Sequence, residues 1–99
     1  MRKIKLMPDY QCFPLWEASD GMLGNIDPNS LPISQTLKVD LAEWAHSFDL
    51  TLNLDDPPSS GFPDAQTEDA FIQQGNELGI RLQEELGQSF EVILSVASA

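Results

Sequence analysis

The spacing of hydrophobic residues constrains the fold of this chain more than any other sequence feature. In residues 34–48, apolar side chains return every three or four positions, as one face of an α-helix requires, at Leu37, Leu41, Trp44, Ala45 and Phe48. Residues 67–86 carry a second stripe of the same kind, at Phe71, Leu78, Leu82 and Leu86. Each stretch has suitable ends, because Ser34 is a favoured N-cap and Gly87 suits the left-handed residue that closes a helix. The sequence therefore predicts two helices, with Trp44 in the core.

Glycine and charge in the second stretch predict how it packs. Gly75 and Gly79 each cost about 1 kcal/mol in a helix interior relative to alanine, so we expect them to permit close contact with a sheet or with the other helix. Glu77 and Arg81 have the spacing of an i, i+4 ion pair, and Arg81 can also reach Glu85.

Short stretches of alternating apolar and polar residues predict strands around these helices. One precedes Pro8, and another runs through residues 90–96. Two more flank the Asp20-Gly21 pair, whose turn chemistry predicts a hairpin, and Pro14 delays the first of these two strands or places it at an edge. Residues 50–54 also alternate and predict a short extended segment before a proline-rich loop. Because residues 90–96 are apolar on both faces, we expect the last strand to be central.

These elements predict an α+β fold, with two helices packed on a small, mostly antiparallel sheet of about four strands. The two terminal strands are candidates for pairing with each other. Ninety-nine residues suffice for one core, so we expect a single domain over residues 1–99.

Charge limits the classes of partner. The chain has sixteen carboxylates and five bases, and three of the bases, Arg2, Lys3 and Lys5, lie at its start. Residues 6–99 therefore carry sixteen carboxylates against Lys38 and Arg81, a net charge of −14. Such a chain repels phosphate backbones and anionic lipids, which argues against nucleic acid and membranes as partners. It attracts basic proteins, although the same charge also serves solubility alone.

Residue types that carry catalysis or metal binding are scarce. Cys12 and His46 are the only thiol and the only imidazole, and nothing in the sequence brings them together. They are too few for a structural zinc site. The segment from Asn25 resembles a calcium loop, but Ser30 and Thr36 stand where that loop needs glycine and glutamate. We therefore expect no enzyme activity, no cofactor and no metal.

Two features bear on the compartment. The single cysteine suits a reducing environment, and the first residues contain no apolar run long enough for a secretory signal. We therefore expect a cytoplasmic protein, which the sequence allows to be a monomer or a homodimer.

Aromatic and acidic residues in expected loops are the candidates for partner binding. Tyr10 lies in a proline-bounded stretch and Phe62 in the acidic loop, and large aromatic residues beside carboxylates are typical of protein-binding hot spots. The carboxylates that we expect to contact a partner belong to that loop and to two turns: Asp20, Asp27, Asp55, Asp56 and Asp64. The alternative is that the two rings fold back onto the core.

Several short motifs resemble a known group of proteins. They are Pro8-Asp9-Tyr10 before Cys12-Phe13-Pro14-Leu15-Trp16, then Ile26-Asp27-Pro28, then Trp44 with Phe48-Asp49 and Thr51-Leu52-Asn53, and finally Asp56-Pro57 with Ser60-Gly61-Phe62. Together they span most of the chain, which resembles small acidic bacterial proteins of unassigned activity, among them immunity proteins of polymorphic or contact-dependent toxin systems. The resemblance implies an antitoxin role and assigns no role to individual residues.

The leading hypothesis is a non-enzymatic inhibitor that binds and neutralises a basic toxin domain. A nuclease is the favoured class of toxin, because a cleft that holds a phosphate backbone is positive. Two alternatives are a small cytoplasmic adaptor or accessory protein, and an acidic DNA mimic that occupies a transcription or restriction protein. An enzyme or small-ligand binder is a third class, which a pocket lined by converging polar groups would favour.

Overall fold

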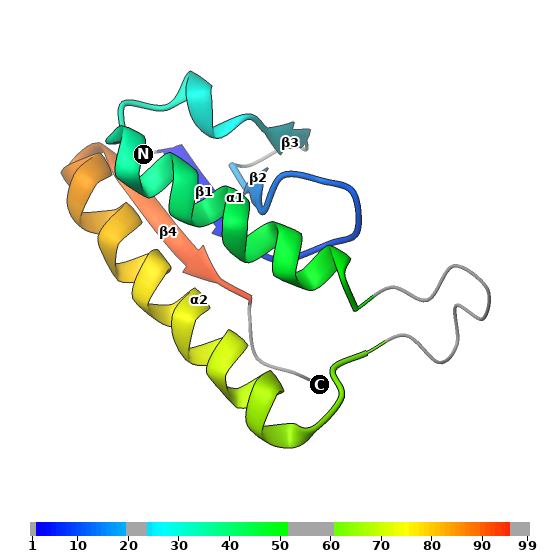
Figure 1. The fold of residues 1–99 in the computed structure, drawn as a ribbon. Coiled ribbons are helices and arrows are strands. Elements are labelled where there is room, and N and C mark those ends of the chain that lie inside the picture. The colour runs from blue at the N-terminus through cyan, green and yellow to red at the C-terminus, as the bar shows by residue number, and fades with distance from the viewer. Residues whose placement is uncertain (1, 20–23, 52–60, 96–99) are drawn as a thin grey trace.

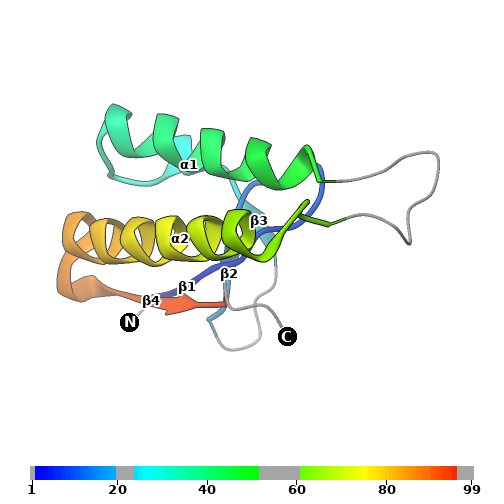
Figure 2. The ribbon, with the colours of Figure 1, turned by 60° about the horizontal axis from the view of Figure 1, so that its bottom comes forward.

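The computed structural model describes residues 2–19, 24–51 and 61–95. Its elements follow in the order β1 (Arg2–Leu6), β2 (Leu15–Glu17), β3 (Gly24–Ile26), the 3₁₀ helix η1 (Pro28–Ser30), α1 (Gln35–Asp49), α2 (Ala65–Leu86), the 3₁₀ helix η3 (Gly87–Ser89) and β4 (Phe90–Leu94). Both α-helices lie on one face of the sheet, so the molecule has two layers (Figure 1 and Figure 2). The predicted α+β class is confirmed. Within the described ranges, neither helix combines the length and the hydrophobicity that crossing a lipid bilayer requires.

The four strands are arranged in the order β3-β2-β1-β4. β1 pairs antiparallel with β2, and β2 pairs antiparallel with β3, which confirms the predicted hairpin. The Asp20-Gly21 turn itself lies outside the described residues. β2 begins directly after Pro14, as expected from the amide that proline lacks. The first and last strands pair in parallel, with Ile4 opposite Val92.

One expectation about the sheet is wrong, because β4 lies at an edge and not in the centre. Apolar residues on both faces of a strand do not indicate whether other strands lie on both of its sides. Val92 is on the side of the helices, and half-buried Ile93 is on the opposite side, next to Lys5 of β1.

The helix ends follow local hydrogen-bonding rules. The hydroxyl of Ser34 accepts from the Leu37 amide at 3.2 Å, and the carboxylate of Asp64 accepts from the Thr67 amide at 2.7 Å, so each side chain caps its helix. Gly87 closes α2 with a φ of 77°, which glycine adopts without strain. α2 thus begins at Ala65, two residues before the predicted start, and both helices end where the sequence indicates.

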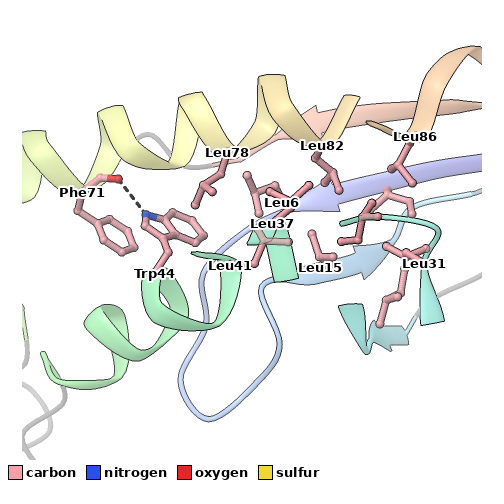
Figure 3. Packing of buried hydrophobic residues seen from close by; sticks show 13 residues of the cluster. Leu6, Leu15, Leu31, Leu37, Leu41, Trp44, Phe71, Leu78, Leu82 and Leu86 are labelled. Atoms are coloured by element: carbon pink, nitrogen blue, oxygen red, sulfur yellow. Dashed lines mark hydrogen bonds between the residues drawn. The ribbon is translucent and has the colours of Figure 1, made fainter. Parts of the chain in front are cut away.

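The core lies between the two layers (Figure 3). Buried residues of the strands, Ile4, Leu6, Leu15 and Ile26, meet the predicted stripes of both helices. Trp44 is completely buried, its ring stacks on Phe71 at a centroid distance of 4.5 Å, and its Nε1–H donates to the Phe71 carbonyl at 3.0 Å. The predicted place of Trp44 in the core is confirmed.

α2 contacts both of its neighbours through specific residues. A Cβ atom on Gly79 would overlap the side chain of Leu94, so this glycine permits close packing of α2 on β4. On the other side, Arg81 pairs with Asp40 of α1 at 2.7 Å and not along its own helix as expected. Glu85 instead accepts from the Ser34 hydroxyl at 2.8 Å. Charges on α2 therefore bind the two helices together.

The second face of the sheet is covered by no helix or strand of the described residues. Its side chains alternate with the core residues of the strands, and we call it the open sheet face: Lys3, Lys5, Trp16, Asn25, Glu91 and Ile93. The predicted extended segment of residues 50–54 is wrong at its first two residues, because Leu50 continues the helical backbone with a φ of −67° and a ψ of −14°; residues 52–54 lie outside the described ranges. Leu50 and Thr51 form the turn that ends α1.

Candidate partner-binding surface

The structure places four of the seven predicted contact residues. Asp20, Asp55 and Asp56 lie outside the described residues. Tyr10, Phe62 and Asp64 lie where the end of α1 meets the start of α2, while Asp27 lies on the other side of α1. The predicted set is therefore divided between two surfaces.

Tyr10 and Phe62 belong to an aromatic cluster of five rings, whose other members are Trp44, Phe48 and Phe71. Tyr10 stacks on Phe48 at a centroid distance of 4.5 Å, and Phe62 contacts Phe71 at 5.0 Å. Phe48 and Phe71 lie 5.8 Å apart and join the two pairs. Both predicted anchors are half-buried, so each is partly packed in the cluster and partly accessible at the surface.

Phe62 lines two surface grooves at this end of the molecule. One has a volume of about 380 Å³ and is bordered by Leu50, Pro63 and Phe71. The other has a volume of about 360 Å³, and Tyr10 and Glu68 are among the residues that line it. A partner side chain can thus contact Phe62 from either groove and Tyr10 from the second.

Hydrogen bonds hold the loop of Tyr10 against α1. The Tyr10 hydroxyl lies 3.2 Å from the Thr51 hydroxyl, and the Gln11 amide donates to the Asp49 carboxylate at 2.8 Å. Gln11 has a φ of 59°, a left-handed conformation that costs energy in a residue other than glycine. The loop is closed at its base by the Met7 amide, which donates to the Pro14 carbonyl at 2.9 Å. The position of the Tyr10 ring is therefore set before any partner arrives.

Carboxylates surround the aromatic cluster. Asp49 ends α1, Asp64 caps α2, and Glu68 lies in the first turn of α2. The Thr67 backbone amide, which donates to Asp64, holds the pKa of this carboxyl below its ordinary value. Between Lys38 and Arg81 the sequence has nine carboxylates and no lysine or arginine. We call the surface formed by Tyr10, Phe62, Asp49, Asp64 and Glu68 the acidic aromatic end.

Asp49 and Glu68 were not predicted as contact residues. Asp49 follows directly on Phe48 of the helical stripe, and Glu68 precedes Phe71 by three residues, so both are one turn or less from a ring of the cluster. Assigning charges to helix ends would have found them.

Asp27 lines a third groove, of about 500 Å³, between the Tyr10 loop, η1 and α1, and this groove shares Asp49 with the acidic aromatic end. Its carboxylate accepts from the Asn29 amide at 2.9 Å and so caps η1. Cys12 and His46 line the same groove, together with Lys38 and Asp49, although no sequence motif predicted that they would lie near each other. In the described residues no hydrogen bond joins the thiol to the imidazole, and no group of three or more His, Cys, Asp or Glu side chains could hold a metal ion.

Comparison with known proteins identifies the family. A family model described as Serratia CdiI immunity protein-like matches residues 2–96. No curated protein matches the chain significantly. The match confirms the resemblance to immunity proteins of contact-dependent toxin systems that the sequence motifs predicted. Since it spans nearly the whole chain, this protein belongs to the Serratia CdiI immunity protein-like family.

Proposed function

We propose that this protein neutralises a basic toxin domain, with a nuclease as the favoured class, by covering it with the acidic aromatic end. Membership of an immunity protein family implies a cognate toxin as the partner. One observation carries the finer proposal: two half-buried rings, Tyr10 and Phe62, are fixed in a surface that has carboxylates, and among the described residues no lysine or arginine lines either groove that borders them. The chain would act in the cytoplasm and by binding alone.

The two kinds of residue would have different tasks. Large rings in rigid, partly desolvated positions supply most of the binding energy at protein interfaces. Carboxylates at the rim speed the encounter with a positive surface and set its orientation. A nuclease cleft is positive because it binds a phosphate backbone, so this surface is complementary to it in charge.

The remaining predicted carboxylates are compatible with the same surface. Asp55 and Asp56 belong to residues 52–60, and both neighbours of that segment, Thr51 and Gly61, are at the aromatic cluster, where the Gly61 amide donates to the Thr51 carbonyl at 3.0 Å. We therefore include Asp55 and Asp56 in the proposed interface. Asp27 lines a different groove and is not included, and Asp20 stays a prediction.

A matched pair of double variants tests the proposal against the purified product of the adjacent gene. Asp64→Asn with Glu68→Gln removes two charges from the acidic aromatic end, and asparagine retains the capacity to cap α2. Glu77→Gln with Glu84→Gln removes two charges from exposed positions farther along the same helix. We expect Kd at low salt to rise about tenfold in the first variant and less than threefold in the second, as measured by calorimetry.

Equal effects of the two variants would show that the charge acts only through the net field. Absence of association with that toxin at low salt would overturn the proposal. Salt-insensitive binding of a different partner would instead favour the adaptor hypothesis.

A further inference from the structure

The two edges of the sheet differ in how much backbone they offer to another strand. β3, at one edge, has only three residues. β4, at the other edge, has five, with the sequence Phe-Glu-Val-Ile-Leu, and four of the five are apolar. Long apolar edge strands pair readily with other chains, whereas very short ones do not. β4 is therefore the edge that needs protection.

Alternation along β4 identifies the backbone groups at its outer edge. The Ser95 amide donates to the Leu6 carbonyl of β1 at 2.9 Å, so odd-numbered residues of this strand direct their backbone groups toward β1. The backbone groups of Phe90 and Val92 consequently point away from the sheet.

These outward groups are bound by one side chain of α2. The Gln83 amide nitrogen donates to the Phe90 carbonyl at 2.8 Å, and the Gln83 amide oxygen accepts from the Val92 amide at 2.9 Å. The nitrogen also donates to the Gly87 carbonyl at 3.1 Å. In a parallel pair of strands, a residue donates to the residue before its partner and accepts from the residue after it. The Gln83 side chain makes the same two bonds around Glu91, so it occupies the place of a residue in a fifth, parallel strand.

The packing of α2 explains how a helix residue reaches the edge of a strand. Gly79 lets α2 approach β4 closely, since a Cβ there would overlap Leu94. Gln83 follows Gly79 by one helical turn and so lies on the same side of α2. Figure 2 shows α2 running alongside the whole of strand β4.

We propose that Gln83 is a strand surrogate that closes the outer edge of β4 to a second copy of this chain. A second copy is the relevant occupant because it presents the same apolar edge and can pair with it by two-fold symmetry. The net charge of −11 repels a second copy at a distance. The Gln83 side chain therefore matters most at high salt, where this repulsion is screened.

The test compares Gln83→Ala with Gln73→Ala, a change at an exposed position of the same helix. Hydrogen exchange of the Val92 amide should become at least about tenfold faster in monomeric Gln83→Ala at low concentration and low salt, because the amide loses its acceptor. At 0.5 M salt and rising concentration, light scattering should show the mass of this variant increasing toward that of a dimer. Gln73→Ala should match the parent protein in both measurements.

A second substitution distinguishes pairing through the β4 edge from nonspecific association. Leu94→Lys places a charge on the edge strand, so it should return Gln83→Ala to a monomer. Unchanged exchange at Val92 would overturn the proposal, and so would a monomeric Gln83→Ala at every concentration and salt. Association that persists in the Leu94→Lys double variant would do the same. Should Gln83→Ala fail to fold, Gln83→Met keeps the side-chain length without the amide and is measured in the same way.

Discussion

The helices and the strands of this protein divide its charge unequally. α1 and α2 together hold eight carboxylates and two bases, a net charge of −6. The four strands hold three bases and two carboxylates, a net charge of +1. The bases Lys3 and Lys5 lie with Trp16 on the open sheet face, whereas carboxylates surround the rings at the acidic aromatic end. The carboxylates are thus not spread evenly over the surface, and electrostatic attraction would orient a basic partner toward the helices.

The two tryptophans give the largest expected difference between the layers. Trp44 is fully buried between the helices, so Trp44→Ala should lower the free energy of unfolding by about 3–5 kcal/mol. Trp16 is half-buried on the open sheet face and donates to the Met7 carbonyl at 3.0 Å, so Trp16→Ala should cost about 1–2 kcal/mol. Urea unfolding followed by circular dichroism measures both values. Equal losses would mean that the open sheet face is packed as tightly as the core.

The next comparison is between charges at the acidic aromatic end and charges on the open sheet face, in their effect on how strongly salt slows association with the toxin. Rim charges act mainly on the rate of encounter, so the rate of toxin binding should fall about tenfold between low and physiological salt. Stopped-flow measurements should give a weaker salt dependence for Asp64→Asn with Glu68→Gln. Lys3→Gln with Lys5→Gln should leave the rate within about twofold, because these residues lie on the other layer. A large effect of the lysine changes would place the interface on the open sheet face.

Titration of Glu17 tests the sheet layer alone. Burial raises the pKa of this carboxyl, but hydrogen bonds from Ser19 and Arg2 outweigh that effect and leave the pKa below its ordinary value of 4.5. A lowered pKa in the folded state stabilises the protein above pH 4.5, and this contribution is lost as the pH falls through the lowered pKa. Glu17→Gln should therefore cost about 1 kcal/mol at pH 7. The difference from the parent protein should shrink below pH 4.5, as measured by urea unfolding at several pH values.

The contact between the layers gives the smallest expected effect. In Gly79→Ala, the gain in helix propensity is about 1 kcal/mol, and the displacement of Leu94 opposes it, so the net change should be within about 0.5 kcal/mol. Adding the same change to Leu94→Ala should stabilise that variant by about 1 kcal/mol, because the obstruction is gone. Thermal unfolding of the parent protein, the two single variants and the double variant measures these changes as a double-mutant cycle. A large loss in Gly79→Ala alone would show that Leu94 cannot move.

Local rules were sufficient for much of this fold. The helical stripes, the Ser34 cap, Gly87 and the hairpin depend on neighbouring residues, and the structure confirms all of them. The edge position of β4 was not predictable in this way, because the side chain of Gln83, on the helix that precedes the strand, takes the role of a neighbouring strand. Arg81 shows the same limit, since its partner Asp40 is 41 positions away and not four.

The candidate surface was predicted in its residue types more than in its arrangement. Tyr10 and Phe62 were singled out as anchors with a core role as the alternative, and in the structure each ring is partly packed and partly accessible. Stacking of rings from the loop, α1 and α2 depends on how these elements meet, which composition does not indicate. Their use in toxin binding remains a prediction for the variants above.

The parallel pairing of β1 with β4 also has a consequence for biosynthesis. Arg2 lies opposite Phe90, so two residues separated by 88 positions must meet before the sheet is complete. At roughly 5–20 residues per second, a ribosome needs about 4–18 s to deliver the second of them. A nascent chain in this interval has no finished β-sheet. Only completed molecules can therefore protect the cell, so steady production of this protein in advance has a clear advantage.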